Sequence, residues 1–272
     1  MGLRINTNVA ALNAIRILRR NTLDLNKTLE RLSSGLRINR AADDAAGLAI
    51  AEGFRSVVRG SRVAIRNAQD GISLIQTAEG ALIESSNILQ RIRELAVQSA
   101  NGTNSNENRA ALDTEVSQLL QQLDAIARDT EFNGFRMLSA PISLMIQVGP
   151  YSGQVMTITI NGAKTSDLGV NGLSISTQTG AVAALSLVDN AIKSINILRS
   201  NFGAFQNRLE FTISVLEIQE ENAAYSESQI RDADIAQETV RFTRNQILVS
   251  AGTSVLAQAN VIPQTALQLL RG

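Results

Sequence analysis

The sequence predicts a mainly α-helical chain: a long antiparallel bundle or coiled-coil rod with a small β-hairpin element in the middle of the chain. Three observations predict it. Proline, which interrupts helices, occurs only at Pro141, Pro150 and Pro263, so residues 1–140 and 151–262 can form long helices. Apolar residues repeat with a heptad period over most of both stretches. Aromatic residues are only 3% of the chain and Trp is absent, which is unusual for a compact globular core.

The longest helix is expected over Asp44–Ala100. Alternating steps of three and four residues through 54–96 meet only apolar or small side chains, which is the pattern of a continuous heptad seam. Asp43 or Asp44 is suited to cap the first turn, and Asn101-Gly102 favours the end. At 1.5 Å per residue the helix is about 85 Å long, so it requires partner helices along its length.

Two further seams supply those partners. One runs from Leu112 to Ile126, on a shorter helix that begins near Ser105 and ends at the turn DTEFNG. The other runs from Ala184 to Ala223 in the C-terminal half of the chain. Three seams from distant parts of one chain predict an antiparallel helical bundle.

The middle of the chain has a different pattern. Residues 142–148, 154–160 and 173–176 are short runs rich in Ile, Val and Thr, and Gly, Pro, Asn and Ser separate them. These are strand and hairpin signals. They predict a small β element, roughly residues 135–180, that caps one end of the bundle.

Apolar heptads also mark both ends of the chain. The C-terminal helix carries two neighbouring apolar stripes, so a single partner helix would leave one of them in water. Such a patch marks an interaction surface, and we therefore expect burial between subunits. The repeats are Ala11, Ile15, Leu18, Thr22, Leu25, Leu29 and Leu32 at the N-terminal end, and Ile235, Phe242, Val249 and Leu256 beside Leu248, Val255, Ile262 and Leu269 at the C-terminal end.

Composition excludes several function classes. The 25 acidic and 25 basic residues are interspersed, which gives no basic footprint for nucleic acid. No apolar stretch approaches the roughly 20 residues of a membrane span, so membrane insertion is not expected. His and Cys are absent, so the commonest general base and thiolate metal ligands are missing. Asp43-Asp44 is better explained as a helix cap than as a metal or acid–base pair. We expect no catalytic residues, no cofactor, no metal and no enzyme activity.

The run SSGLRINRAADDAAGLAIAE, Ser33 to Glu52, closely resembles the N-terminal signature of bacterial flagellin, the subunit of the flagellar filament. Further similar blocks are NAQDGISLIQTAEGAL, LQRIRELAVQSANG, FGAFQNRLEFTI, ESQIRDADIAQE and ILVSAGTSVLAQANVIPQTALQLLRG. Together they cover roughly residues 1–140 and 185–272. Only about 50 residues separate the two halves, so the chain resembles a short member of the family that lacks large outer domains.

The resemblance implies a structural subunit that self-assembles into the filament for swimming motility. It implies an inner-tube domain of terminal helices, residues 1–43 with 230–272. A helical rod of residues 44–134 with 181–229 would surround the tube, and residues 135–180 would form the β element at the end of the rod. The residues expected to assemble the inner tube are Ile15, Leu18, Leu25, Leu29, Leu32, Val249, Leu256, Ile262 and Leu269.

The resemblance also implies partners: other copies of the chain, a flagellin export chaperone, hook-associated junction and cap proteins, and toll-like receptor 5 of animal hosts. The family's receptor contact matches Arg91, Leu95 and Glu115, and Arg91 and Leu95 are spaced i and i+4 on one helix face. The N-terminal residues lack the apolar region of a secretory signal, which alone suggests a cytosolic protein. The resemblance instead implies a secreted, extracellular filament protein that is exported without a cleaved signal peptide.

Two alternatives remain open at this point. A hook–filament junction protein is related at both termini, although its signature is usually looser than Ser33–Glu52. A helical adaptor or secreted effector would bind a partner through its C-terminal helix and would form a soluble, stoichiometric complex without polymerising.

Overall fold

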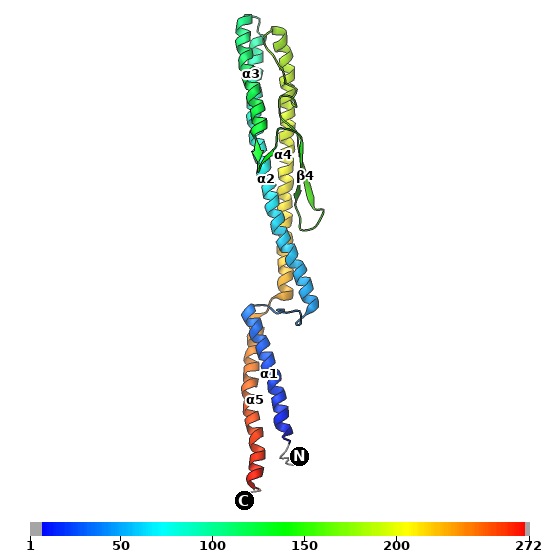
Figure 1. The fold of residues 1–272 in the computed structure, drawn as a ribbon, viewed down its shortest axis with the longest axis vertical. Coiled ribbons are helices and arrows are strands. Elements are labelled where there is room, and N and C mark those ends of the chain that lie inside the picture. Colours follow the sequence, from blue (N-terminus) through cyan, green and yellow to red (C-terminus); the bar gives the residue numbers. More distant parts are fainter. Residues whose placement is uncertain (1–6, 270–272) are drawn as a thin grey trace. The chain divides into compact units, whose positions relative to one another are not determined.

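The computed structural model describes residues 7–269, with side chains as far as Val261 (Figure 1). Within this range the chain is mainly α-helical with a small β-hairpin, as the sequence predicted. The elements are α1 (Val9–Ser34), α2 (Ala45–Ala100), α3 (Asn106–Asp129), β1 (Glu131–Phe132), β2 (Phe135–Arg136), β3 (Ile142–Gln147), β4 (Val155–Ile160), α4 (Gln178–Arg231) and α5 (Ile235–Leu269).

The chain forms two compact units. Unit 1 comprises residues 1–56 with 222–272, and unit 2 comprises residues 57–221. Both boundaries fall inside the long helices α2 and α4, whereas the sequence analysis divided the chain where helices begin and end. The division into inner-tube, rod and β domains stays a prediction.

Local capping signals set the helix ends. The Asn8 side chain accepts a hydrogen bond from the Ala11 N–H at the start of α1 (3.1 Å). Asp44 accepts from the Gly47 N–H (2.8 Å) and so acts as a predicted cap. Ser105, where a helix was expected to begin, accepts from the Asn108 N–H (3.3 Å) and caps α3. Gly35 ends α1 in the left-handed conformation with φ 71°, which glycine adopts without steric cost. Helix α5 continues through Pro263 to Leu269, because a helix can continue across the single hydrogen bond that proline removes.

Unit 2 is an antiparallel bundle of α2, α3 and α4, which lie side by side in Figure 1. Ion pairs show that α2 and α4 are antiparallel, since higher-numbered residues of α2 pair with lower-numbered residues of α4. The three pairs are Arg62–Glu220 at 2.6 Å, Glu79–Arg199 at 3.6 Å and Arg93–Asp189 at 2.8 Å. The predicted seams form the core between the helices: Ile75, Leu82, Leu89 and Ile92 of α2, Val116 and Leu123 of α3, and Val188, Ile195, Phe202 and Leu209 of α4 are fully or almost fully buried.

Strands β3 and β4 form an antiparallel hairpin that pairs Ile142 with Ile160 and Gln147 with Val155. The hairpin lies along the side of α2 and does not cap an end of the bundle, which corrects the expectation. Glycines permit this position, because a Cβ on Gly60 would lie 2.8 Å from Pro150 Cβ, and one on Gly71 would lie 2.5 Å from Ile146 Cδ1.

The run Leu173–Ser176 is not a strand, contrary to prediction. Its backbone is satisfied by side chains of neighbouring helices. The Ile175 N–H donates to Asp113 Oδ1 of α3 (2.6 Å), and the Ile175 carbonyl accepts from Ser99 Oγ of α2 (2.6 Å). A segment whose polar backbone groups have such partners needs no neighbouring strand.

By length and composition alone, α4 contains a window apolar enough to cross a membrane. The sequence analysis considered only uninterrupted apolar stretches and therefore did not find this window, which contains isolated charges such as Asp189. Several of the apolar residues in this part of α4 belong to the core of unit 2, including Ala184, Val188 and Ile195. A third of the window is buried in the bundle, so packing accounts for part of its hydrophobicity.

Arg109 of α3 closes the C-terminal end of α2. The side chain is buried, and its guanidinium donates to the carbonyl oxygens of Ser99, Asn101 (3.0 Å) and Asn104 (3.2 Å). These carbonyls lie where an α-helix has no partners of its own. One charged side chain therefore ties the end of α2 to the start of α3.

Arg109→Ala is expected to lower the free energy of unfolding by about 3 kcal/mol, because it leaves buried carbonyls without donors. Arg128→Ala is the matched control on α3, since Arg128 is exposed and pairs only with Asp129. It should change stability by less than about 0.5 kcal/mol. Urea unfolding followed by circular dichroism measures both. Equal losses in the two variants would contradict the capping role.

Candidate functional site

Helices α1 and α5 pair along one continuous seam in unit 1. On α1 the least exposed side chains recur every three or four residues, and a matching series occurs on α5. This is the knobs-into-holes pattern of a two-helix coiled coil. The seam residues are Ala11, Ala14, Leu18, Asn21, Leu25, Thr28 and Leu32 of α1, and Glu238, Phe242, Asn245, Val249, Gly252, Leu256 and Ala259 of α5.

Polar groups inside the seam fix its register. Asn245 Nδ2 donates to Thr28 Oγ1 (3.2 Å), and that hydroxyl donates in turn to the Asp24 carbonyl (2.5 Å). At the far end, Asn8 Nδ2 donates to the Ala259 carbonyl (2.8 Å). A slip by one helical turn would leave these groups without partners, which is costly in a half-buried seam.

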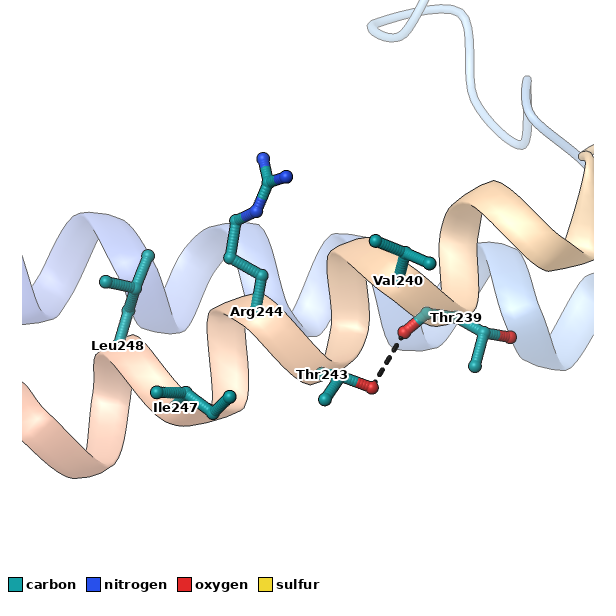
Figure 2. Close-up of a pocket in the computed structure, with 6 residues that line it drawn as sticks. All are labelled: Thr239, Val240, Thr243, Arg244, Ile247 and Leu248. Carbon is teal, nitrogen blue, oxygen red and sulfur yellow. Dashed lines mark hydrogen bonds between the residues drawn. The ribbon is translucent and has the colours of Figure 1, made fainter.

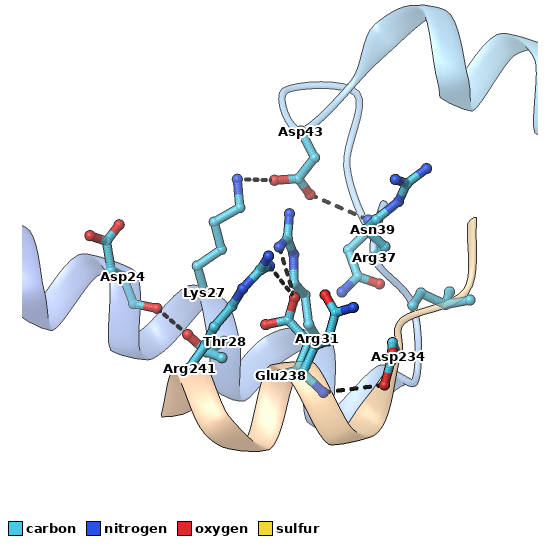
Figure 3. Close-up of polar contacts among 12 residues, drawn as sticks. Asp24, Lys27, Thr28, Arg31, Arg37, Asn39, Asp43, Asp234, Glu238 and Arg241 are labelled. Atoms are coloured by element: carbon cyan, nitrogen blue, oxygen red, sulfur yellow. Dashed lines mark hydrogen bonds and ion pairs between the residues drawn. The ribbon is translucent and has the colours of Figure 1, made fainter. Parts of the chain in front are cut away.

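A compact ionic cluster closes the other end of the pair (Figure 3). Glu238 is buried, and its carboxylate pairs with Arg31 of α1 (3.2 Å) and Arg241 of α5 (2.8 Å). It lies in the first turn of α5, where the helix dipole favours a negative charge. Asp234 caps that turn by accepting from the Ala236 N–H (2.9 Å).

The link between α1 and α2 folds back onto this cluster. The Lys27 ammonium lies 2.6 Å from Asp43 Oδ1, and Asp43 Oδ2 accepts from the N–H groups of Asn39 and Arg40 (3.3 and 3.2 Å). The hydrogen bond from Lys27, helped by those two N–H groups, lowers the pKa of Asp43 below its ordinary value of 3.8. Asp43 therefore stays charged and holds the link to α1.

Backbone hydrogen bonds tie the same link to the end of α4. The Arg37 N–H donates to the Arg231 carbonyl (2.7 Å), and the Ala233 N–H donates to the Gly35 carbonyl (2.9 Å). The Arg37 guanidinium also donates to the Ile230 carbonyl (2.5 Å). The two connections of unit 1, after α1 and before α5, thus form one joint.

Outside the seam, both helices expose large apolar side chains to solvent. On α5, a shallow groove of about 410 Å³ is lined by two turns of one helix face (Figure 2). The groove is lined by Thr239, Val240, Thr243, Arg244, Ile247 and Leu248. We call the exposed apolar residues the outer faces of the pair: Val9, Leu12, Ile15, Ile17, Leu23 and Leu29 on α1, and Ile235, Val240, Ile247, Leu248, Val255 and Val261 on α5.

The residues predicted for inner-tube assembly divide between these two surfaces. Ile15 and Leu29 lie on the outer face of α1, whereas five others are half-buried in the seam: Leu18, Leu25, Leu32, Val249 and Leu256. The side chains of Ile262 and Leu269 lie outside the described residues. Their shared role in assembly stays a prediction.

The predicted receptor residues are only partly together on the surface of unit 2. Arg91 of α2 and Glu115 of α3 are exposed and form an ion pair at 2.9 Å, and this hydrogen bond raises the pKa of Arg91. Leu95 is only 1% exposed and belongs to the core. The packing of the helices around Leu95 covers it, whereas Arg91, four residues earlier on α2, remains exposed. The role of the three residues in receptor recognition stays a prediction.

Comparisons with known proteins agree with this architecture. The family model of the bacterial flagellin N-terminal helical region matches residues 5–141, and that of the bacterial flagellin C-terminal helical region matches residues 185–270. The chain belongs to the bacterial flagellin family. Flagellins are structural filament proteins and not enzymes, as the sequence predicted.

Similar flagellins align over nearly their whole length. The chain is 47% identical to the flagellin of Halalkalibacterium halodurans, over 98% of this chain and 99% of the relative. It is 45% identical to the flagellar filament 33 kDa core protein of Treponema phagedenis, again over 98% and 99%. The crystal structure of Bacillus cereus flagellin is 34% identical, covers 55% of this chain and 88% of its own, and has a TM-score of 0.48. The short middle segment agrees with a flagellin without large outer domains.

Sequence reasoning missed the polar residues of the seam. Thr28, Glu238 and Asn245 did not appear among the apolar heptads, although Glu238, Asn245, Gly252 and Ala259 recur every seven residues. This heptad of small and polar residues was the available signal. Among the described residues, no group of three acidic side chains is suited to bind a metal.

Asp43→Asn should destabilise the protein at neutral pH, because it removes the charge that holds Lys27. The pKa of Asp43 is lowered by folding, so its contribution is fully present above the ordinary value of 3.8 and is lost as pH falls through the lower folded value. The difference between variant and wild type should therefore shrink progressively as pH falls below 3.8.

Thermal unfolding over a pH series measures this difference. Asp24→Asn removes an equal charge from an exposed position of α1 and is the matched control, for which little change is expected at any pH. An Asp43→Asn defect that persists undiminished at low pH would show that the carboxylate charge is not its cause.

Proposed function

We propose that this flagellin polymerises with copies of itself into the filament that drives swimming, through the outer faces of the α1–α5 pair. One observation carries the proposal. Unit 2 buries its seams among three helices, whereas each helix of unit 1 has one partner and leaves a second apolar face in water. Val255 is 59% exposed in this state.

Self-association buries these faces against the same faces of other copies, so no different partner protein is needed. Apolar area removed from water is worth roughly 25 cal/mol per Å², and every subunit of a polymer supplies the same two faces. Stacking many copies therefore sums small gains into a stable tube. The absence of formal net charge removes the long-range repulsion that would oppose such stacking.

The same faces suit the other partners implied by the family. Before export, a flagellin chaperone would cover the groove on α5, whose apolar walls would otherwise promote early assembly (Figure 2). Hook-associated junction and cap proteins would receive the outer faces at the two ends of the filament. Export would proceed without a cleaved signal peptide, which leaves the N-terminal helix available for assembly.

We extend the proposal to recognition of the monomer by toll-like receptor 5. Arg91 and Glu115 present an exposed charge pair on adjacent helices, in which both Nε and Nη2 of Arg91 reach the same oxygen, Glu115 Oε1. Such a rigid arginine is a common anchor at protein interfaces. Leu95 packs beneath this surface and would support the helix position without touching the receptor.

Val255→Asp should abolish seeded polymerisation, because it buries an unpaired charge between subunits. Val182→Asp is the matched control, since Val182 of unit 2 is the same residue type and is 57% exposed. Electron microscopy after seeding scores filaments, and circular dichroism checks that each monomer folds. Normal filaments from the Val255→Asp variant would contradict the assembly role of the outer face. Leu256→Asp should also prevent assembly, with loss of the seam itself.

Arg91→Ala and Glu115→Ala should each lower the potency of the monomer in a receptor reporter assay by roughly tenfold. Arg93→Ala is the control, because Arg93 is another exposed arginine of α2 and pairs with Asp189. It should signal like wild type. An equal loss in Arg93→Ala would show that the effect is not specific to the Arg91–Glu115 pair, and unchanged potency of Arg91→Ala would remove the proposed contact.

A further inference from the structure

An apolar strip lies on the outside of α4, away from the core of unit 2. Phe211, Val215 and Ile218 are 74%, 64% and 60% exposed. Their spacing of i, i+4 and i+7 places them on one helix face. No described residue covers this α4 strip, although it is as apolar as a core seam.

A row of carboxylates borders the α4 strip along one side. Glu210, Glu217 and Glu221 are exposed and share one edge of the helix at spacings of seven and four residues. Among the described residues, none of the three has an ion-pair partner. Glu210 only accepts a hydrogen bond from Gln206 (3.0 Å). The strip and its border therefore require a partner that is apolar and basic.

Helix α2 carries such a surface in the same unit. Arg59, Val63 and Arg66 are exposed on one face, again at i, i+4 and i+7. Neither guanidinium forms an ion pair within the described part of the chain. Asn67 Nδ2 bonds the hairpin at the Gln147 carbonyl (3.1 Å) on one side of this α2 strip, and Arg62 pairs with α4 on the other. The strip is thus open between the hairpin and α4, and it ends at Asp70.

We propose that the α4 strip of one copy docks on the α2 strip of the next copy in the filament. Arg59 and Arg66 are seven residues apart, as are Glu210 and Glu217, so both rows repeat at about 10.5 Å and can pair in register. The arginine stems also present methylene groups and planar guanidiniums, which pack on exposed rings such as that of Phe211.

Charge selects this pairing over docking between two α4 strips. Two α4 faces would bring acidic rows together, whereas α4 against α2 joins opposite charges. The strips also lie at the same level of unit 2, because Arg62 pairs with Glu220 and Leu209 packs against Gly71. A laterally placed copy can therefore meet both strips without a large shift along the helices. The inference rests on the proposed polymerisation and adds a contact outside the α1–α5 pair.

Charge reversal tests the contact in the full-length chain. Arg59→Glu with Arg66→Glu, and Glu210→Arg with Glu217→Arg, should each raise the critical concentration for seeded polymerisation by roughly tenfold or more. The variant with all four changes should return to within about threefold of wild type, because opposite charges face each other again. Sedimentation of filaments measures the critical concentration, and circular dichroism confirms that each monomer folds.

Arg136→Glu with Lys193→Glu is the control, since both residues are exposed in unit 2 and the net-charge change equals that of the α2 reversal. It should polymerise like wild type. Unaffected polymerisation of either reversed pair, or failure of the fourfold variant to recover, overturns the docking of α4 on α2 and indicates that the α4 strip faces a different partner. Wild-type chains that do not polymerise would instead overturn the proposed function, and this contact with it.

Discussion

The structure depends on one constraint: a heptad helix cannot bury its own apolar seam. The apolar surface that each helix buries is therefore set by the number of partners beside it. Helix α2 extends for 56 residues, and within unit 2 it meets α3, α4 and the β3–β4 hairpin. There the seam is closed, and residues such as Leu82 and Leu89 are fully buried. In unit 1 the same kind of repeat has a single partner, so α1 and α5 share one seam and keep a second apolar face. The same kind of heptad repeat is covered by several partners in unit 2 and by only one in unit 1. This difference distinguishes the faces of unit 1 that are proposed to assemble from the core of unit 2.

A two-helix seam has too little apolar area to define its own alignment, and polar groups supply the missing specificity. The Thr28–Asn245 hydrogen bond and the Arg31–Glu238 pair each demand one register. Burying Glu238 costs desolvation energy, which two arginines and the N-terminal end of α5 offset. The same cluster fixes the direction in which the outer faces point, since the link through Lys27 and Asp43 joins it to the rest of unit 1. Polar residues that weaken the seam as a hydrophobic contact thus make its geometry unique.

Local signals were readable from the sequence, and non-local ones were not. The cap at Asp44 and the start of α3 near Ser105 were predicted correctly because a cap involves only the next three residues. The seams of α2, α3 and α4 were predicted correctly because the heptad repeat continues over many turns of each helix. Leu173–Ser176 was mistaken for a strand, since the side chains of Asp113 and Ser99 that satisfy its backbone are distant in sequence. Leu95 was expected beside Arg91 on one helix face because the period gives a face, but only tertiary packing decides that Leu95 is buried and Arg91 is exposed.

Two kinds of contact with opposite responses to salt follow from the proposed surfaces. Burial of the outer faces is strengthened by precipitating salts, which are excluded from apolar surface. Pairing of Glu210 and Glu217 with Arg59 and Arg66 is weakened by salt, because exposed charges are screened beyond about 8 Å at physiological ionic strength. The formal net charge of zero does not prevent a local row of carboxylates on α4 and a local pair of arginines on α2. Ionic strength can therefore separate the two contacts: high salt should keep the tube of terminal helices while weakening the pairing of the α4 strip with the α2 strip.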